Sequence, residues 1–337
     1  MPSATIEGVP SMQIRRFNAA LAAMAMLAPV LASCAGSGTS ALQLPSRAGT
    51  VPLAGARAPR VKSYMKNVDV LTRLTYIADA RNSFVAVFGR NGQQIGTISD
   101  GLLVPVGLFV DGRRNLWVAN NAAANVLEFP RGATSPSTIL DDSGYTPYDV
   151  TICRNGTIYV SNQYAGSLAP GSISVYAPGS TQPTGLLQYP GEVYNDFVTC
   201  DAENNVFTTV DFASGSGVIE YPGGNQSGAT QLPISVAMAG GIKLDDAGNL
   251  LVNDRELHTI TEYTEAGVPT GNAIPTGKGD WVDIAVTKNS RVVLGADAFF
   301  VRGSSLTWPA GAYRQTYNSG QFGLPLGAAF DPGQKGI

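Results

Sequence analysis

Hydrophobic and polar residues alternate along most of the chain from residue 70 onward, in short segments separated by polar turns. Segments such as 125–129 and 259–263 alternate with a period of two, which is typical of half-buried β-strands. No convincing helical period is found in this region. The pattern therefore predicts an all-β fold for this part of the chain.

One unit recurs along this region: a short apolar strand, a polar turn, a second strand, and then an Asn or Asp. Successive units are 42, 48, 44 and 42 residues long when measured between the ends of their first strands, which are Asp111, Cys153, Asp201, Asp245 and Thr287. A period of about 40–50 residues with four short strands per unit is typical of a β-propeller blade.

The two ends of the repeat region complete the count of blades. Residues 74–99 supply a second, third and fourth strand, whereas residues 325–331 supply a first strand with no partner after it. Asp331 lies 44 residues past Thr287, in phase with the repeat. We therefore predict a six-bladed β-propeller whose C-terminal first strand joins the N-terminal blade and closes the ring, which also covers a strand edge. A pair of β-sandwiches or a seven-bladed ring is the alternative.

The N-terminal segment has a different pattern. Arg15 and Arg16 precede an apolar run over residues 19–31, which suits a signal peptide and is too short for a membrane-spanning helix. A start at Met12 gives a signal peptide closer to the typical pattern than a start at Met1 does. The chain can therefore be interpreted as starting at either methionine.

The apolar run ends in Leu31-Ala32-Ser33-Cys34, which resembles the bacterial lipobox. The resemblance implies cleavage before Cys34, acylation of that cysteine, and stable anchoring to the inner or outer bacterial membrane. We therefore expect a signal peptide over 1–33, a lipidated flexible tether over 34–66 and the propeller over 67–337. An ordinary cleaved leader with an incidental cysteine is the alternative.

The repeats also resemble those of the NHL family of six-bladed propellers. The resemblance rests on the second strands at 116–120 and 158–162 and on Asp-Asp-Ala-Gly-Asn-Leu-Leu-Val at 245–252. It implies the fold and says little about activity, because one fold hosts many functions.

Composition restricts the function further. The 337 residues carry a formal net charge of −3 with 14% charged residues, which excludes the basic footprint of a nucleic-acid binder. The three cysteines fit no zinc or redox spacing. Cys153 and Cys200 end the first strands of adjacent blades, so they are either a disulfide or two separate core residues.

Candidate chemistry lies where the innermost strands begin, at one mouth of the central channel. Asp149, Asp196 and Asp283 come from three blades and are predicted to converge there, with oxygen ligands that suit Ca²⁺ rather than zinc. The alternative is that they cap loops or are solvated, in which case no cofactor is required.

Tyr148, Tyr194, Asn195 and Trp281 lie beside the same strand starts. Aromatic and polar side chains around a concave mouth can bind a carbohydrate or a peptide. Ordinary packing is an equal alternative for each residue.

Two function classes follow. The first is a monomeric cell-envelope lipoprotein whose non-catalytic propeller binds an envelope protein, a peptide or a carbohydrate. The second is a metal-dependent hydrolase or lyase. Gluconolactonase-like propellers, which this chain resembles at Asp196, hold a metal at these strand starts, but Val106, Tyr148 and Gly240 stand at other such positions. A lyase with a histidine base would need His258, which the repeat places away from the channel. We therefore expect a binding protein.

Overall fold

The computed structural model describes residues 61–66, 68–69, 73–165 and 170–332. The expected signal peptide, the lipobox with Cys34 and most of the expected tether lie outside these residues. In the described part, regular structure consists of strands and two short 3-10 turns, η1 (Asn121–Ala123) and η2 (Pro222–Gly224). None of the described helices has the length and apolar character that a membrane span requires. The prediction of an all-β fold is confirmed.

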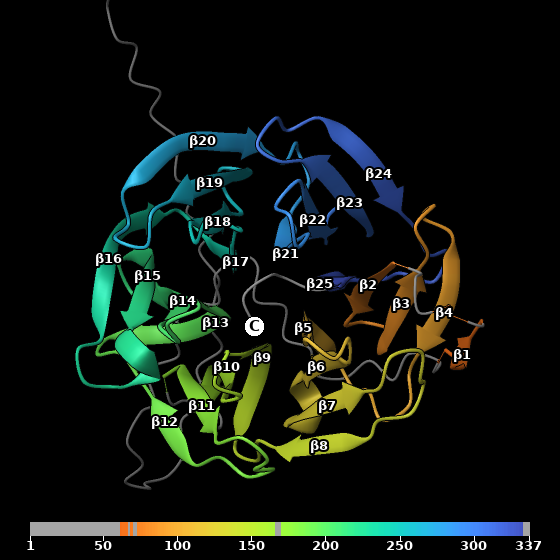
Figure 1. Cartoon of the computed structure of the whole chain (residues 1–337), viewed down its shortest axis with the longest axis horizontal. Coiled ribbons are helices and arrows are strands. Elements are labelled where there is room, and N and C mark those ends of the chain that lie inside the picture. The colour runs from red at the N-terminus through yellow and green to blue at the C-terminus, as the bar shows by residue number, and fades with distance from the viewer. Residues whose placement is uncertain (1–60, 67, 70–72, 166–169, 333–337) are drawn as a thin grey trace, which may run out of the picture. The chain divides into compact units, whose positions relative to one another are not determined.

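Six antiparallel sheets surround a central axis as the blades of a propeller (Figure 1). From the axis outward the strands are, in blade 1, β25 (Pro325–Asp331), β2 (Leu74–Asp79), β3 (Phe84–Phe88), β4 (Gln94–Ile98) and β1 (Tyr64–Met65); in blade 2, β5 (Pro105–Val110), β6 (Leu116–Asn120), β7 (Asn125–Phe129) and β8 (Thr138–Asp141); in blade 3, β9 (Tyr145–Ile152), β10 (Ile158–Ala165), β11 (Ser172–Tyr176) and β12 (Gly185–Leu187); in blade 4, β13 (Glu192–Cys200), β14 (Val206–Phe212), β15 (Gly215–Tyr221) and β16 (Thr230–Val236); in blade 5, β17 (Ala239–Leu244), β18 (Leu250–Asp254), β19 (Thr259–Tyr263) and β20 (Pro269–Pro275); and in blade 6, β21 (Trp281–Val286), β22 (Val292–Asp297), β23 (Arg302–Thr307) and β24 (Tyr313–Tyr317).

The ring closes as the repeat phase predicted. β25 pairs antiparallel with β2, from Leu74 opposite Asp331 to Asp79 opposite Pro325. Every residue of β25 is buried. The last of the described strands is therefore the innermost strand of the first blade.

Blade 1 has a fifth strand that the repeat pattern did not indicate. β1 lies on the outer edge of β4, with Tyr64 opposite Thr97 and Met65 opposite Gly96. These two residues belong to the segment expected to be a tether, so regular structure begins before the expected boundary at residue 67. The short strand covers part of an otherwise open sheet edge.

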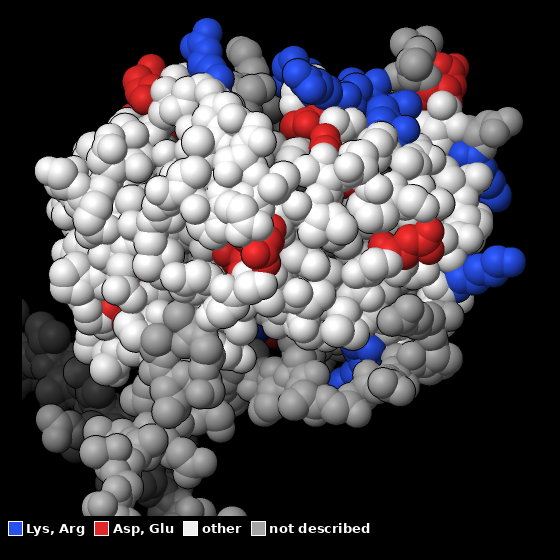
Figure 2. Space-filling model, turned by 90° about the horizontal axis from the view of Figure 1, so that it is seen from below, with Lys and Arg blue, Asp and Glu red and all other residues white. Residues whose placement is uncertain are grey.

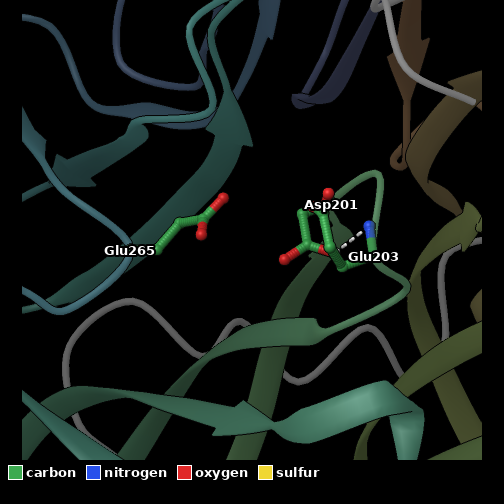
Figure 3. A group of neighbouring side chains, drawn as sticks. All are labelled: Asp201, Glu203 and Glu265. Carbon is green, nitrogen blue, oxygen red and sulfur yellow. Dashed lines mark hydrogen bonds between the residues drawn. The ribbon is translucent and has the colours of Figure 1, made fainter.

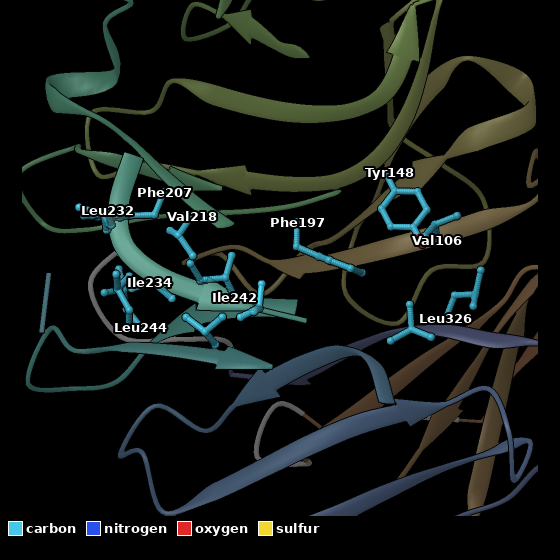
Figure 4. Packing of buried hydrophobic residues seen from close by; sticks show 14 of the residues in the cluster. Val106, Tyr148, Phe197, Phe207, Val218, Leu232, Ile234, Ile242, Leu244 and Leu326 are labelled. Carbon is cyan, nitrogen blue, oxygen red and sulfur yellow. The ribbon is translucent and has the colours of Figure 1, made fainter. Parts of the chain in front are cut away.

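Apolar side chains fill the propeller axis near the beginnings of the inner strands. Figure 4 labels four of them from different blades: Val106, Tyr148, Phe197 and Leu326. Together with Val282 they are at most 8% exposed and belong to one buried cluster. The axis is therefore packed at this level.

An Asp ends the second strand in three blades and has a structural role there. Asp254 accepts hydrogen bonds from two amides of its own turn and from Ala237 N at 2.7 Å, in the loop that leads into β17. Asp79 and Asp297 make the same two kinds of contact. One carboxylate thus joins two loops at the same end of a blade. We call this end of the propeller the upper face and the opposite end the lower face.

Cys153 and Cys200 form a disulfide between blades 3 and 4. Their Cα atoms lie 5.7 Å apart, within the range that a disulfide requires. The two residues lie at the lower ends of β9 and β13, and both are buried. The bond therefore joins two adjacent inner strands at matching heights.

Candidate functional site

A buried lysine lies between two of the three carboxylates that the sequence suggested as metal ligands. Lys243 Nζ lies 3.1 Å from Asp149 Oδ2 and 3.8 Å from Asp283 Oδ1. Both carboxylate side chains are fully buried, and the lysine side chain is only 9% exposed. β17, β9 and β21, from three different blades, supply the three residues. An ammonium group therefore lies between these two acids.

The same two carboxylates also join neighbouring blades through backbone amides. Val198 N donates to Asp149 Oδ2 at 3.2 Å, and Ala328 N donates to Asp283 Oδ2 at 3.0 Å. In each case the acceptor lies on one inner strand and the donor on the next. These contacts use oxygen lone pairs that a metal ion would need.

Burial dominates the ionisation of this cluster. It raises the pKa of Asp283 to about 7, while the Lys243 ammonium acts in the opposite direction. Burial also raises the pKa of Asp149, again against the effect of Lys243. For Lys243 burial favours the neutral form, but the two carboxylates outweigh it and raise its pKa. The arrangement is a charged structural centre.

The third suggested ligand, Asp196, makes a different contact. Its Oδ1 accepts a hydrogen bond from Gln163 Nε2 at 3.1 Å, and the residue is 6% exposed. Burial raises the pKa of Asp196 to about 7, and the negative charge of Asp211 adds to the rise. An acid that titrates near neutrality beside a channel mouth is a candidate for proton transfer.

An ion pair lies on the same upper side. Arg255 donates from Nε and Nη2 to the two oxygens of Asp280, at 2.9 and 2.8 Å. Two parallel bonds of this kind fix the geometry of both side chains. The charge of Arg255 also opposes the rise in the pKa of Asp196. The pair therefore belongs to the electrostatic surroundings of that acid.

Three of the four residues suggested for ligand binding lie in the interior. Tyr148 is 7% exposed and packs edge-on against Phe197 with ring centroids 5.2 Å apart, while Trp281 is 2% exposed and Asn195 is fully buried. The starts of the strands that carry these three residues lie in packed layers, so the three side chains have a structural role. Tyr194 differs, because it is partly exposed and lies edge-on to Tyr164.

Asn195 is bonded to a buried acid that the sequence did not single out. Its Nδ2 donates to Glu192 Oε2 at 3.2 Å, and its Oδ1 accepts from the Thr208 hydroxyl at 2.6 Å. Burial raises the pKa of Glu192 to about 8. The hydrogen bond from the Asn195 amide acts in the opposite direction and lowers the pKa of Glu192.

Large apolar side chains are exposed around the upper face. We call five of them the upper rim: Leu103, Tyr164, Leu257, Phe299 and Phe300, which are 45%, 37%, 64%, 67% and 45% exposed. Leu103 lies in the loop that leads into β5, Tyr164 lies near the end of β10, and the other three lie at turns after second strands, all at the same end of the blades. Arg302 lies over the Phe300 ring at 4.9 Å. The sequence analysis suggested aromatic residues beside the strand starts and missed these positions.

The described residues contain one cluster of acids with the spacing of a cation site. Asp201, Glu203 and Glu265 each offer an oxygen within 4.8 Å of the others. Figure 3 shows them on two separate turns, and its dashed line marks the bond of 2.9 Å from Glu203 N to Asp201 Oδ1. Both oxygens of Asp201 accept hydrogen bonds from its own turn. The acids come from different blades, so their approach could not be found from spacing.

His258, the only histidine of the sequence, lies in the turn between β18 and β19 with φ of 53°. Its carbonyl oxygen accepts a hydrogen bond from Thr276 N at 2.8 Å, in blade 5.

The sequence matches no family model and no curated protein. Its fold resembles several solved structures. A chain of a nidogen/laminin complex has a TM-score of 0.65 at 11% identity, over 77% of this chain and 98% of that one. A functionally unknown protein from Desulfotomaculum acetoxidans has 0.56 at 10% identity, over 76% and 98%. Virginiamycin B lyase from Staphylococcus aureus, solved with quinupristin, has 0.53 at 15% identity, over 80% and 95%. At these identities the likeness establishes that the chain is similar to β-propellers in fold alone.

Proposed function

We propose that this chain is an exported cell-envelope lipoprotein, anchored through Cys34, whose NHL-type propeller binds a partner with its upper face as a monomer and without catalysis. The observation that carries the proposal is the upper rim. Four of its five large exposed side chains lie on loops or turns of a rigid scaffold, and Tyr164 lies near the end of β10. Binding residues are disproportionately found on loops that a rigid scaffold positions.

The chemistry of the rim favours a protein or peptide over a carbohydrate. Phe299 and Phe300 lie edge-on with ring centroids 4.9 Å apart. Leu257 is the second most exposed of the five, and it adds aliphatic surface. Adjacent exposed aromatic rings such as these suit a protein interface, because aromatic anchors dominate the binding energy of such interfaces.

The interior supports the same proposal. Packed side chains occupy the axis where the inner strands begin, and Lys243 lies between two of the suggested metal ligands. A lactonase-like metal site would need those oxygens for a cation. Contacts that hold the ring together therefore occupy the carboxylates on which metal-dependent catalysis would depend.

The metal-dependent hydrolase or lyase remains the second candidate because of Asp196. Its pKa of about 7 suits a general acid or base at neutral pH. In this alternative, Asp196 would transfer a proton and the upper mouth would hold the substrate.

Site-specific photocrosslinking on the membrane-anchored full chain tests the binding proposal. We would place a benzophenone amino acid at Phe300 or Leu257, and at Ala202 as the control. Ala202 is also exposed but lies in the turn between β13 and β14, on the lower face. We expect the same adduct from both upper positions, no adduct from Ala202, and loss of the adduct in a Phe299→Ser variant.

Equal adducts from both faces, or none from either upper position, would contradict the binding proposal.

The second candidate is tested by activity assays on the purified protein. Turnover of lactones with Ca²⁺ or Mg²⁺ that disappears in Asp196→Asn, with an unchanged melting temperature, would establish the alternative.

A further inference from the structure

Four cationic side chains lie around a pocket on the lower face. The pocket has a volume of about 320 Å³ and lies at the seam where blade 6 meets blade 1. Four cationic side chains line it: Arg73, Arg90, Lys288 and Arg314. They come from the segment before β2, the β3–β4 turn, the β21–β22 turn and β24. Ring closure therefore brings them together from both ends of the chain.

These four cations are exposed, and no acid among the described residues forms an ion pair with any of them. The pocket has one acid, Asp331. Its Oδ2 accepts from Arg131 Nε at 2.8 Å and from Arg114 Nη2 at 3.0 Å, so two other arginines already neutralise it. The pocket therefore keeps a strong excess of positive charge.

This concentration is unusual in a chain with a net charge of −3. Figure 2 shows one side of the molecule, on which much of the surface is uncharged and Lys, Arg, Asp and Glu side chains lie along the upper edge of the view. Clustering four like charges costs free energy unless a ligand of opposite charge compensates them. The pocket thus has the electrostatic character of an anion site.

The other residues that line the pocket can contact a ligand that is larger than an inorganic ion. Tyr317 and Phe330 are 6% and 9% exposed and line it together with Leu74 and Val292. The Gln315 side chain also lines the pocket, and its amide occupies the space where a side chain at Gly92 would lie. An apolar wall, one amide and four cations can accommodate a ligand with an organic body and an anionic group.

We propose that this pocket binds a small phosphate monoester, with the phosphate held by the cations and the organic body against Tyr317 and Phe330. Guanidinium groups match the geometry of phosphate with paired N–H donors. A phosphate monoester carries close to two negative charges at neutral pH, which suits four cations better than a single carboxylate does. The site is separate from the upper rim and does not depend on its function.

Calorimetric titration of the purified full chain with glucose 1-phosphate tests the site, with glucose as the uncharged comparison. We expect binding of the phosphate ester that weakens as salt is added, and no binding of glucose. The Arg90→Glu/Lys288→Glu double variant should weaken binding at least about tenfold. Arg154→Glu is the matched control, because Arg154 is exposed in the β9–β10 turn of the same face and does not line the pocket.

The source of the phosphate is distinguished by a second titration with phosphatidylcholine vesicles that contain phosphatidic acid. Binding of these vesicles in place of the free sugar phosphate, with the same loss in the double variant, would identify a lipid headgroup as the ligand. The milder Arg90→Gln/Lys288→Gln variant repeats the test if charge reversal lowers the melting temperature. Failure to bind either probe, or an equal loss in Arg154→Glu, would overturn the proposal.

Discussion

Replacing Lys243 with Met would leave two buried carboxylates without their cation. Methionine keeps an unbranched apolar stem of similar length but lacks the ammonium that lies 3.1 Å from Asp149 and 3.8 Å from Asp283. The packing around the stem is largely retained. The measured loss of stability is therefore attributable mainly to the missing charge.

The magnitude follows from the burial of both acids, whose side chains have no exposed surface. Removing one partner of a buried ion pair costs about 3–5 kcal/mol, because the remaining charge is uncompensated. For a domain of this size, each kcal/mol lowers the melting temperature by about 2–4 °C. We expect Lys243→Met to melt roughly 6–20 °C below the wild type near neutral pH.

The loss depends on pH with a definite sign. Burial already raises the folded-state pKa of Asp149 and Asp283 above the unfolded value, and removing the ammonium raises it further. A carboxyl group with a raised folded-state pKa contributes stability below its unfolded pKa, and this contribution is lost as pH rises through the folded-state pKa. The deficit of Lys243→Met should therefore be largest near about pH 8 and smaller near about pH 5.

Thermal unfolding followed by circular dichroism at the two pH values measures this effect. Adding Asp149→Asn and Asp283→Asn to Lys243→Met removes the uncompensated charges and should recover part of the loss. A decrease below about 2 °C that is the same at both pH values would refute the reasoning, because it would mean that the acids are neutral or solvated in the native state.

Three further outcomes are expected. Deleting residues 322–337 removes β25, so the truncated chain should lose cooperative unfolding; a melting temperature close to that of the full chain would contradict the closure model. The Cys153→Ser/Cys200→Ser variant should lose about 4 kcal/mol of stability for a loop of this length, measured by urea unfolding under oxidising conditions, and equal stability of the two proteins would contradict a structural disulfide. Cys34→Ala should release the protein from membrane fractions or block its maturation, as read by fractionation and immunoblotting; unchanged processing and membrane binding would exclude this anchor.

The fold was predictable because the repeat is encoded locally. Alternating strands and polar turns recur with a nearly constant period. The position of Asp331 in this period predicted the closing strand, and β25 pairs with β2 as predicted. The edge strand β1 was not predictable in this way. A strand of two residues carries no periodic pattern, and it forms because β4 offers an unpaired edge.

The candidate sites were less predictable, because each joins residues from several blades. Phase alone placed Asp149 and Asp283 near the axis, but it gives no information on how far a long side chain reaches, so Lys243 was missed. The cations of the lower pocket were missed for the same reason, since Arg73 and Arg314 meet only across the seam. Exposure at turns such as 299–300 depends on the loops around them, which pattern analysis does not describe.

The pairing of β25 with β2 has a consequence for how the protein folds. The innermost strand of blade 1, β25, is synthesised after every other described strand, and its partner lies more than two hundred residues earlier. Contacts so distant in sequence slow folding, because the entropy of closing a long loop is lost before the contacts form. Until the final strand arrives, the nascent chain exposes an open sheet edge that can pair with another chain. The ring therefore cannot close until residues 325–331 are available to pair with β2.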